Sequence, residues 1–292
     1  MAWWTGFLGR PATEDYSPEA VLGEGDRDPV ELRYLGTAGF VLQGHGRTLV
    51  LDPYLSRLGP WTLLSAPLRS DEALLRRHIP QADDVLVGHA HYDHVLDAPC
   101  LCQQTGARLI GSRSTIMVGK AAGLPAAQLY ETAGLEDIAC GDWRVRGLPS
   151  RHGRVYGRVP FPGDIETPPA WPPRMRSLRH GLVLNWYVEV AGLRIVHVDS
   201  ADYLDAQLRD LRADILCLCA VGRQYRPHYT RDIIKLLRPR WVIPCHWDTM
   251  MTPLEAAPDL IPGVDLLGFM EEIRSCGAQP LLLPLLGRMY FR

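Results

Sequence analysis

The chain has 292 residues, 47% of them hydrophobic, which is enough for one large domain or two small ones. Its 31 basic and 33 acidic residues give a net charge of −2, so the charge balance does not predict binding to nucleic acid or to an anionic membrane. No apolar run reaches the ~18–20 residues of a membrane span, and seven cysteines without zinc-ribbon spacing are typical of a reduced, cytoplasmic protein.

We expect residues 1–29, which are polar and contain Pro and Gly, to form an arm that packs on a single domain at 30–292. The first residues lack the basic and apolar segments of a secretory signal. Four apolar side chains near the start could touch a membrane surface; they are Trp3, Trp4, Phe7 and Leu8. Because no Lys/Arg cluster accompanies them, we favour packing against the folded body.

The domain begins with short strands separated by glycine-containing turns, a pattern that predicts hairpins at 31–35, 40–43 and 48–51. After a loop at 54–70, strands and helices alternate. The predicted elements are a helix at 71–78, a strand at 85–88, a helix at 98–105, a strand at 108–111, a helix at 114–122 and a strand at 143–148.

The second half of the chain repeats this order. An irregular stretch at 153–180 leads to a hairpin of strands at 182–190 and 193–198, and the alternation then resumes. The remaining elements are a helix at 203–210, a strand at 214–220, a helix at 230–237, a strand at 241–245, a helix at 266–275, a strand at 281–285 and a short strand at 288–291. Two such halves predict one α/β domain with two sheets face to face and helices outside.

The run His89-Ala90-His91-Tyr92-Asp93-His94 directly follows the apolar strand at 85–88. Three imidazoles and a carboxylate this close together are costly to bury without partners. They suit a divalent cation that accepts both nitrogen and oxygen ligands. An exposed loop that happens to be rich in histidine is the alternative. We favour a metal site, because three of only ten histidines fall in this run.

Three further strand ends supply similar groups. His152 follows the strand at 143–148, Asp199 follows the strand at 193–198, and His246 follows the strand at 241–245. The carboxyl ends of strands are where α/β folds present functional side chains. Together with the first motif, these positions provide seven ligands, enough for two metal ions.

This order of motifs resembles the metallo-β-lactamase superfamily over about residues 31–290. The resemblance implies an αββα sandwich of two mixed sheets with the metal site at one edge. It also implies that His89, His91 and His152 hold one ion, that Asp93, His94 and His246 hold a second, and that Asp199 bridges them. Zinc is the expected metal, and manganese or iron would accept the same ligands.

Finer features resemble the branch that contains L-ascorbate-6-phosphate lactonase and N-acyl-phosphatidylethanolamine phospholipase D. They are Tyr34-Leu35-Gly36-Thr37-Ala38-Gly39-Phe40, Leu51-Asp52-Pro53-Tyr54, His228 and His246-Trp247-Asp248-Thr249. The stretch Val198-Asp199-Ser200 departs from the family, which usually has Gly before the Asp, and Asp202 is a nearby substitute.

The resemblance implies a hydrolase in which a metal-bridging hydroxide attacks a lactone, an ester or a phosphodiester. Asp93 could also orient the nucleophile or accept its proton, and His228 is a candidate for contacting the substrate or leaving group. A structural role for His228 at a helix start is the alternative. Asp52 and His197 are candidates for supporting the ligating side chains. A metal-dependent ligand-binding protein with little turnover and an iron-based redox protein are the other functions considered.

We expect the irregular stretch at 153–180 to border the active-site mouth, because a stretch this long is usually functional or disordered. Residues 143–181 contain eight arginines but only two acidic residues. Arg174 and Arg176 could therefore bind an anionic small molecule, although a solvated basic loop explains the same pattern. Trp171, with Phe161 and Tyr156, could instead form an apolar wall for an acyl or aromatic substrate. A small-molecule substrate is the expected partner, and a homo-oligomer is compatible with the composition.

Overall fold

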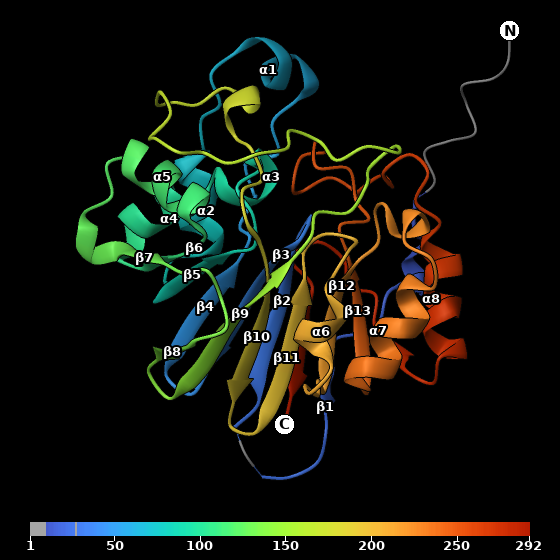
Figure 1. Ribbon diagram of the computed structural model, residues 1–292. Coiled ribbons are helices and arrows are strands. Elements are labelled where there is room, and N and C mark those ends of the chain that lie inside the picture. The colour runs from blue at the N-terminus through green and yellow to red at the C-terminus, as the bar shows by residue number, and fades with distance from the viewer. Residues whose placement is uncertain (1–9, 27) are drawn as a thin grey trace, which may run out of the picture.

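Two mixed β-sheets lie face to face at the centre of the molecule, and helices cover their outer sides (Figure 1). The structure is a computed structural model that describes residues 10–26 and 28–292. The arrangement confirms the predicted α/β sandwich. The four apolar side chains expected near the start of the arm lie outside the described residues.

The first sheet has eight strands among the described residues, in the order β1-β15-β2-β3-β4-β5-β6-β7. Its strands are β1 (Val21–Leu22), β2 (Val30–Gly36), β3 (Gly39–Gly44), β4 (Arg47–Leu51), β5 (Asp84–Val87), β6 (Arg108–Gly111), β7 (Leu129–Glu131) and β15 (Arg288–Phe291). The last strand of the chain therefore joins the sheet built by the first half, so the two sequence halves do not each form a separate sheet.

The second sheet has seven strands in the described chain, in the order β14-β13-β12-β11-β10-β9-β8. Its strands are β8 (Asp137–Cys140), β9 (Trp143–Ser150), β10 (Val183–Val190), β11 (Leu193–Val198), β12 (Ile215–Cys219), β13 (Trp241–Cys245) and β14 (Gln279–Pro280). Strands β11, β12 and β13 are parallel neighbours, so their carboxyl ends lie at the same edge.

Helices α2, α4 and α5 cover the first sheet, and α7 and α8 cover the second (Figure 1). The helices are α1 (Pro60–Ser65), α2 (Glu72–His78), α3 (Tyr92–Val95), α4 (Ala98–Thr105), α5 (Arg113–Ala121), α6 (Asp205–Leu208), α7 (Tyr229–Leu237) and α8 (Leu266–Ser275). Capping fixes where α2 starts, because the Asp71 side chain accepts a hydrogen bond from the Leu74 amide. None of the helices in the described part of the chain is long and apolar enough to cross a membrane.

Alternating side chains of the first sheet enter two different cores. Phe40 and Leu42 pack between the sheets, whereas Val41 packs beneath the outer helices. Burial on both faces explains why these strands read as continuous apolar runs rather than alternating ones.

The predicted strand at 281–285 is wrong. Strand β14 ends at Pro280, and the next residues are buried outside any strand. The backbone of Leu282 exchanges hydrogen bonds with Ser17 of the arm instead of with a neighbouring strand. The predicted helix at 203–210 is also shortened, to the single turn of α6.

Candidate metal centre

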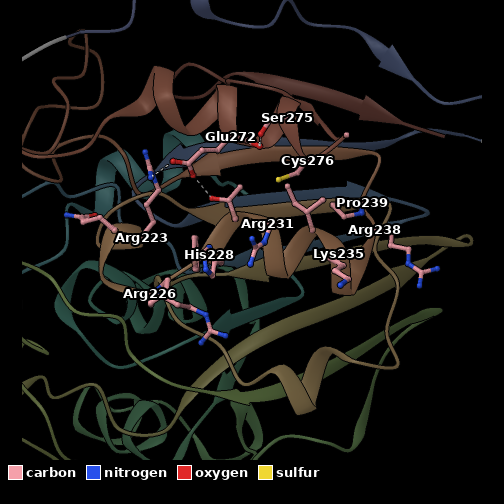
Figure 2. Close-up of a pocket in the computed structure, with 16 residues that line it drawn as sticks. Arg223, Arg226, His228, Arg231, Lys235, Arg238, Pro239, Glu272, Ser275 and Cys276 are labelled. Atoms are coloured by element: carbon pink, nitrogen blue, oxygen red, sulfur yellow. Dashed lines mark hydrogen bonds and ion pairs between the residues drawn. The ribbon is translucent and has the colours of Figure 1, made fainter.

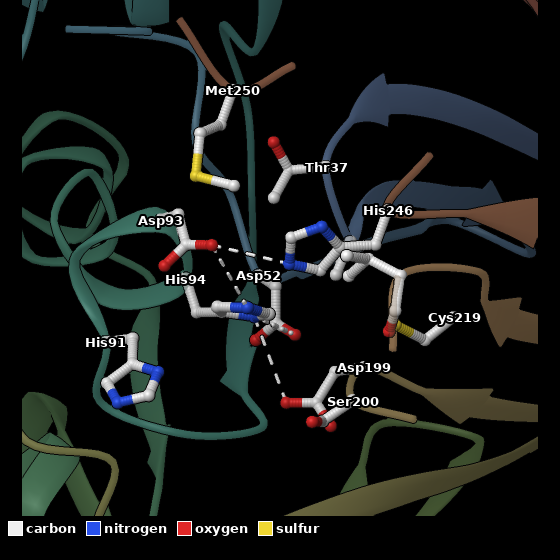
Figure 3. Close-up of polar contacts among 12 residues, drawn as sticks. Thr37, Asp52, His91, Asp93, His94, Asp199, Ser200, Cys219, His246 and Met250 are labelled. Atoms are coloured by element: carbon white, nitrogen blue, oxygen red, sulfur yellow. Dashed lines mark hydrogen bonds and ion pairs between the residues drawn. The ribbon is translucent and has the colours of Figure 1, made fainter. Parts of the chain in front are cut away.

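Seven metal-capable side chains converge where β5, β9, β11 and β13 end. After β5, His89 and His91 lie on the turn into α3, and Asp93 and His94 lie in α3 itself. The other three side chains, His152, Asp199 and His246, follow the other three strands. Figure 3 shows His94, Asp93, His246 and Asp199 directed toward one another. The structure thus brings together all seven ligands proposed from the sequence, from positions up to 157 residues apart (246 − 89 = 157).

The seven side chains form three overlapping groups, and within each group the candidate ligand atoms lie within 4.8 Å of one another. The groups are His89, His91 and His152; Asp93, His94 and His246; and His89, His94 and Asp199. The first two match the two sets that the family resemblance implies. The third places Asp199 against histidines of both sets, with its Oδ2 2.6 Å from His89 Nδ1 and 3.8 Å from His94 Nδ1.

The donor set fits a divalent metal, because the cluster is buried and its polar atoms are not all paired. His91 Nε2, His246 Nδ1 and Asp199 Oδ1 are buried without a hydrogen-bond partner. Unpaired buried polar atoms are costly. Imidazole nitrogens together with carboxylate oxygens are ligands for zinc, manganese or iron.

The histidines of the first group are held in the neutral form that binds metals. Burial, together with the neighbouring imidazoles, lowers the pKa of His89 well below its usual value. Burial also lowers the pKa of His91 to about 4 and, with help from His91, that of His152 to about 3. These rings therefore offer lone pairs rather than positive charge at neutral pH.

Carboxylates dominate the other side of the cluster. Burial alone would lower the pKa of His94, but Asp93 and Asp52 outweigh it and raise that pKa to about 9. Burial and the nearby Asp52 raise the pKa of Asp199 well above its usual value. Both shifts follow from carboxylates crowded on this side of the cluster, where a divalent cation would stabilise their ionised forms.

Two supports hold these ligands in place. Asp52 lies 3.0 Å from His94 Nδ1 through one oxygen and accepts a hydrogen bond from the Gly88 amide through the other, at 2.7 Å. Asp52 therefore lies where it can support a ligating histidine, and its predicted role stays a prediction. Gly88 must lack a side chain, because a Cβ there would collide with the Asp199 carboxylate.

The second support is a buried network around Asp248, which the sequence pattern did not predict. The Asp248 carboxylate accepts hydrogen bonds from Tyr34 Oη at 2.6 Å and from the Thr37 amide at 2.8 Å. Arg57 completes it with a buried ion pair to Asp248 at 2.5 Å. Since the His246 amide donates to the Thr37 carbonyl at 2.5 Å, this network fixes the turn that carries His246. Nothing in the loop at 54–70 distinguished Arg57 from other arginines.

Several predicted site residues lie elsewhere. His228 is exposed in a separate groove beside α7 and does not line the metal pocket. Arg174 donates a hydrogen bond to the Ser65 carbonyl at 3.0 Å, and neither it, Arg176 nor Trp171 lines the pocket. His197 Nε2 is 2.8 Å from the Ala38 carbonyl, so its hydrogen bond goes to the backbone rather than to a ligating residue.

The pocket above the metal ligands is mostly apolar, with a volume of about 310 Å³. Its walls include Tyr156, Phe161, Met175, Met250 and Ile261, and no arginine or lysine of the described chain lines it. The stretch at 153–180 therefore borders the site, as predicted, but it contributes apolar rather than cationic side chains. The geometry favours the apolar-wall hypothesis over the anionic one.

Comparison with known proteins shows the family of the chain. A family model described as a beta-lactamase superfamily domain matches residues 31–246. The chain belongs to this family. It is 28% identical over 246 residues to a UPF0173 metal-dependent hydrolase of Anaeromyxobacter dehalogenans, covering 76% of each chain. It is 28% identical over 239 residues to another of Thermococcus onnurineus, covering 79% of this chain and 89% of the relative.

The fold is also shared with a solved structure, Igni18, described as a novel metallo hydrolase from Ignicoccus hospitalis. The TM-score is 0.59 at 16% identity, and the match covers 90% of this chain and 99% of that one. At this identity the likeness concerns the fold alone. The site must therefore be interpreted from its own residues.

Proposed function

We propose that this protein is a binuclear metal-dependent hydrolase that cleaves an ester or lactone carrying an apolar acyl or aromatic group. The observation that carries the proposal is the position of seven metal-capable side chains at the base of a pocket with apolar walls. The names of the relatives, metal-dependent hydrolases, support the reaction class.

His89, His91 and His152 would hold one ion, and Asp93, His94 and His246 a second, with Asp199 between them. We favour zinc. When bound, such a pair of ions supplies a nucleophile by lowering the pKa of a shared water molecule and stabilises the charge that develops during attack.

The protein's own residues would orient the reaction. Asp93 is 7% exposed, with Oδ2 3.3 Å from His246 Nε2, so the carboxylate stays at the pocket floor and can accept a proton from the attacking water. Tyr92 lines the pocket, and among the described residues its hydroxyl donates only to Met250 Sδ, at 2.8 Å. Sulfur is a weak acceptor, and burial raises the pKa of Tyr92 well above its usual value. This hydroxyl can therefore turn to donate to a substrate oxygen.

The test combines metal analysis with a substrate panel. Metal content is measured on the purified protein, which is then assayed with p-nitrophenyl esters of increasing chain length, aryl lactones and bis(p-nitrophenyl) phosphate. We expect esters or lactones with apolar groups to be turned over best. Met175→Lys should lower kcat/KM for these substrates about tenfold, whereas Met117→Leu in α5, away from the pocket, should leave it unchanged. Preference for the phosphodiester, or turnover unaffected by loss of metal, would contradict the proposal.

A further inference from the structure

A second hollow lies beside α7 and α8, with a volume of about 930 Å³ (Figure 2). It shares no lining residue with the metal pocket. Five cationic side chains and one carboxylate line it, although the whole chain has a net charge of −2. Positive charge is therefore concentrated here and absent from the pocket where the sequence had suggested it.

Two of the arginines form fixed walls. Arg223 is 2.9 Å from the Glu272 carboxylate and lies over the Phe269 ring. Arg226 lies 3.7 Å over the Tyr203 ring and pairs with Asp205 at 3.1 Å. Their charges are already balanced by acidic neighbours, so they shape the groove rather than supply its surplus charge.

The surplus charge comes from Arg231, Lys235 and Arg238. Arg231 and Lys235 are four residues apart on α7, and Arg238 directly follows the helix as its C-cap residue. Figure 2 shows the three following one another along the groove. Lys235 and Arg238 have no acidic partner among the described residues, and Arg231 contacts only its exposed neighbour Asp232, at 3.1 Å. Like charges at this spacing destabilise a helix unless a counter-charge is present.

We propose that this groove binds a small molecule carrying two or more phosphate groups. The guanidinium group of arginine can donate two parallel hydrogen bonds to phosphate oxygens, and the lysine ammonium group supplies a compact positive charge. The three cations follow one another along the groove, so a ligand with more than one phosphate could contact them together. The volume lies within the range of small-molecule sites, about 300–1,000 Å³. This inference does not depend on the proposed hydrolytic activity.

Stabilisation of α7 is a simpler explanation for these cations, and the test must distinguish it from ligand binding. Cations near a helix C-terminus stabilise the helix without any ligand, and Lys235 and Arg238 are at the end of α7. On that account the groove would show no saturable affinity for phosphates. The ligand account requires saturable binding that depends on these two side chains.

The experiment is calorimetric titration of the metal-loaded protein with inorganic pyrophosphate at low salt. We expect saturable binding, at least tenfold weaker in Lys235→Glu/Arg238→Glu and progressively weaker as salt is added. The matched control is Arg76→Glu/Lys120→Glu, which makes the same charge change on α2 and α5, where both side chains are exposed and Lys120 is also in a last helical turn. It should bind as the wild type does.

Pyrophosphate can also bind metals, so His89→Ala is titrated in parallel. Binding that persists in His89→Ala and falls in the groove variant supports the proposal. Binding lost in His89→Ala but kept in the groove variant overturns it, as does the absence of saturable binding. If the charge-reversed variant does not fold, as judged by thermal unfolding, Lys235→Gln/Arg238→Gln replaces it with the same criteria.

Discussion

The buried ion pair behind the metal ligands yields a prediction whose size follows from the structure. Arg57 and Asp248 have 1% and 0% exposed side chains, and their charged atoms are 2.5 Å apart. Burial alone would raise the pKa of Asp248, but Arg57 and the hydrogen bonds from Tyr34 and Thr37 together outweigh burial, and the pKa lies below its usual value. In Arg57→Ala the carboxylate stays buried without its charge partner. Such a loss costs roughly 3–5 kcal/mol.

This loss is measurable by thermal unfolding followed by circular dichroism. Since about 1 kcal/mol corresponds to roughly 2–4 °C in a domain of 150–250 residues, we expect Tm to fall by at least about 6 °C. The control is Arg144→Ala, which breaks a solvent-exposed pair with Glu189 and should change Tm little. A decrease in Arg57→Ala no larger than in Arg144→Ala would refute the reasoning.

A second variant tests the cause. Adding Asp248→Asn to Arg57→Ala removes the stranded charge while keeping the side-chain shape. The double variant should then be more stable than Arg57→Ala alone. If the double variant is less stable than the single one, an unpaired carboxylate is not the source of the loss.

Three further predictions concern the metal centre. His89→Ala and His246→Ala should lose bound metal, measured by mass spectrometry, with unchanged far-UV circular dichroism, whereas His45→Ala in a turn should retain it. Gly88→Ala should lower the metal content, and it should lower the free energy of unfolding by about 1–3 kcal/mol, because the added methyl group collides with the Asp199 carboxylate. A metal content equal to that of the wild type would contradict this packing. Removing metal from the loaded protein with a chelator should lower Tm, because a ligand bound only to the folded state stabilises it, and an unchanged Tm would argue against a metal held by the folded site.

Local sequence patterns sufficed to predict most strands and helices, because periodicity and turn chemistry are properties of neighbouring residues. They failed where distant segments compete for backbone hydrogen bonds. The run at 281–285 has the composition of a strand, yet the backbone of Leu282 pairs with Ser17, more than 260 residues away, and only Leu281 of this described run bonds to the neighbouring strand β13. The membership of β15 in the first sheet has the same origin.

The metal ligands could be predicted because each follows an apolar strand, and strand ends converge in α/β folds. The residues that hold those ligands could not. Arg57 and Asp248 are 191 residues apart, and neither stands in a pattern that points to the other. Arg174 and Arg176 illustrate the opposite error, since a count of arginines in a loop says nothing about which way the side chains point.

The metal pocket and the groove beside α7 differ in their charged side chains, so the two sites suit different kinds of ligand. Cations at the bound oxygens favour phosphate recognition. No arginine or lysine of the described residues lines the metal pocket, whereas the groove beside α7 has three with no buried partner. A phosphodiester at the metal centre would have to rely on the ions alone for its charge. An uncharged carbonyl substrate needs only the apolar walls for binding and the metals for attack. The His89→Ala and Lys235→Glu/Arg238→Glu variants should therefore each lose one ligand and keep the other, an outcome that a single shared site could not produce.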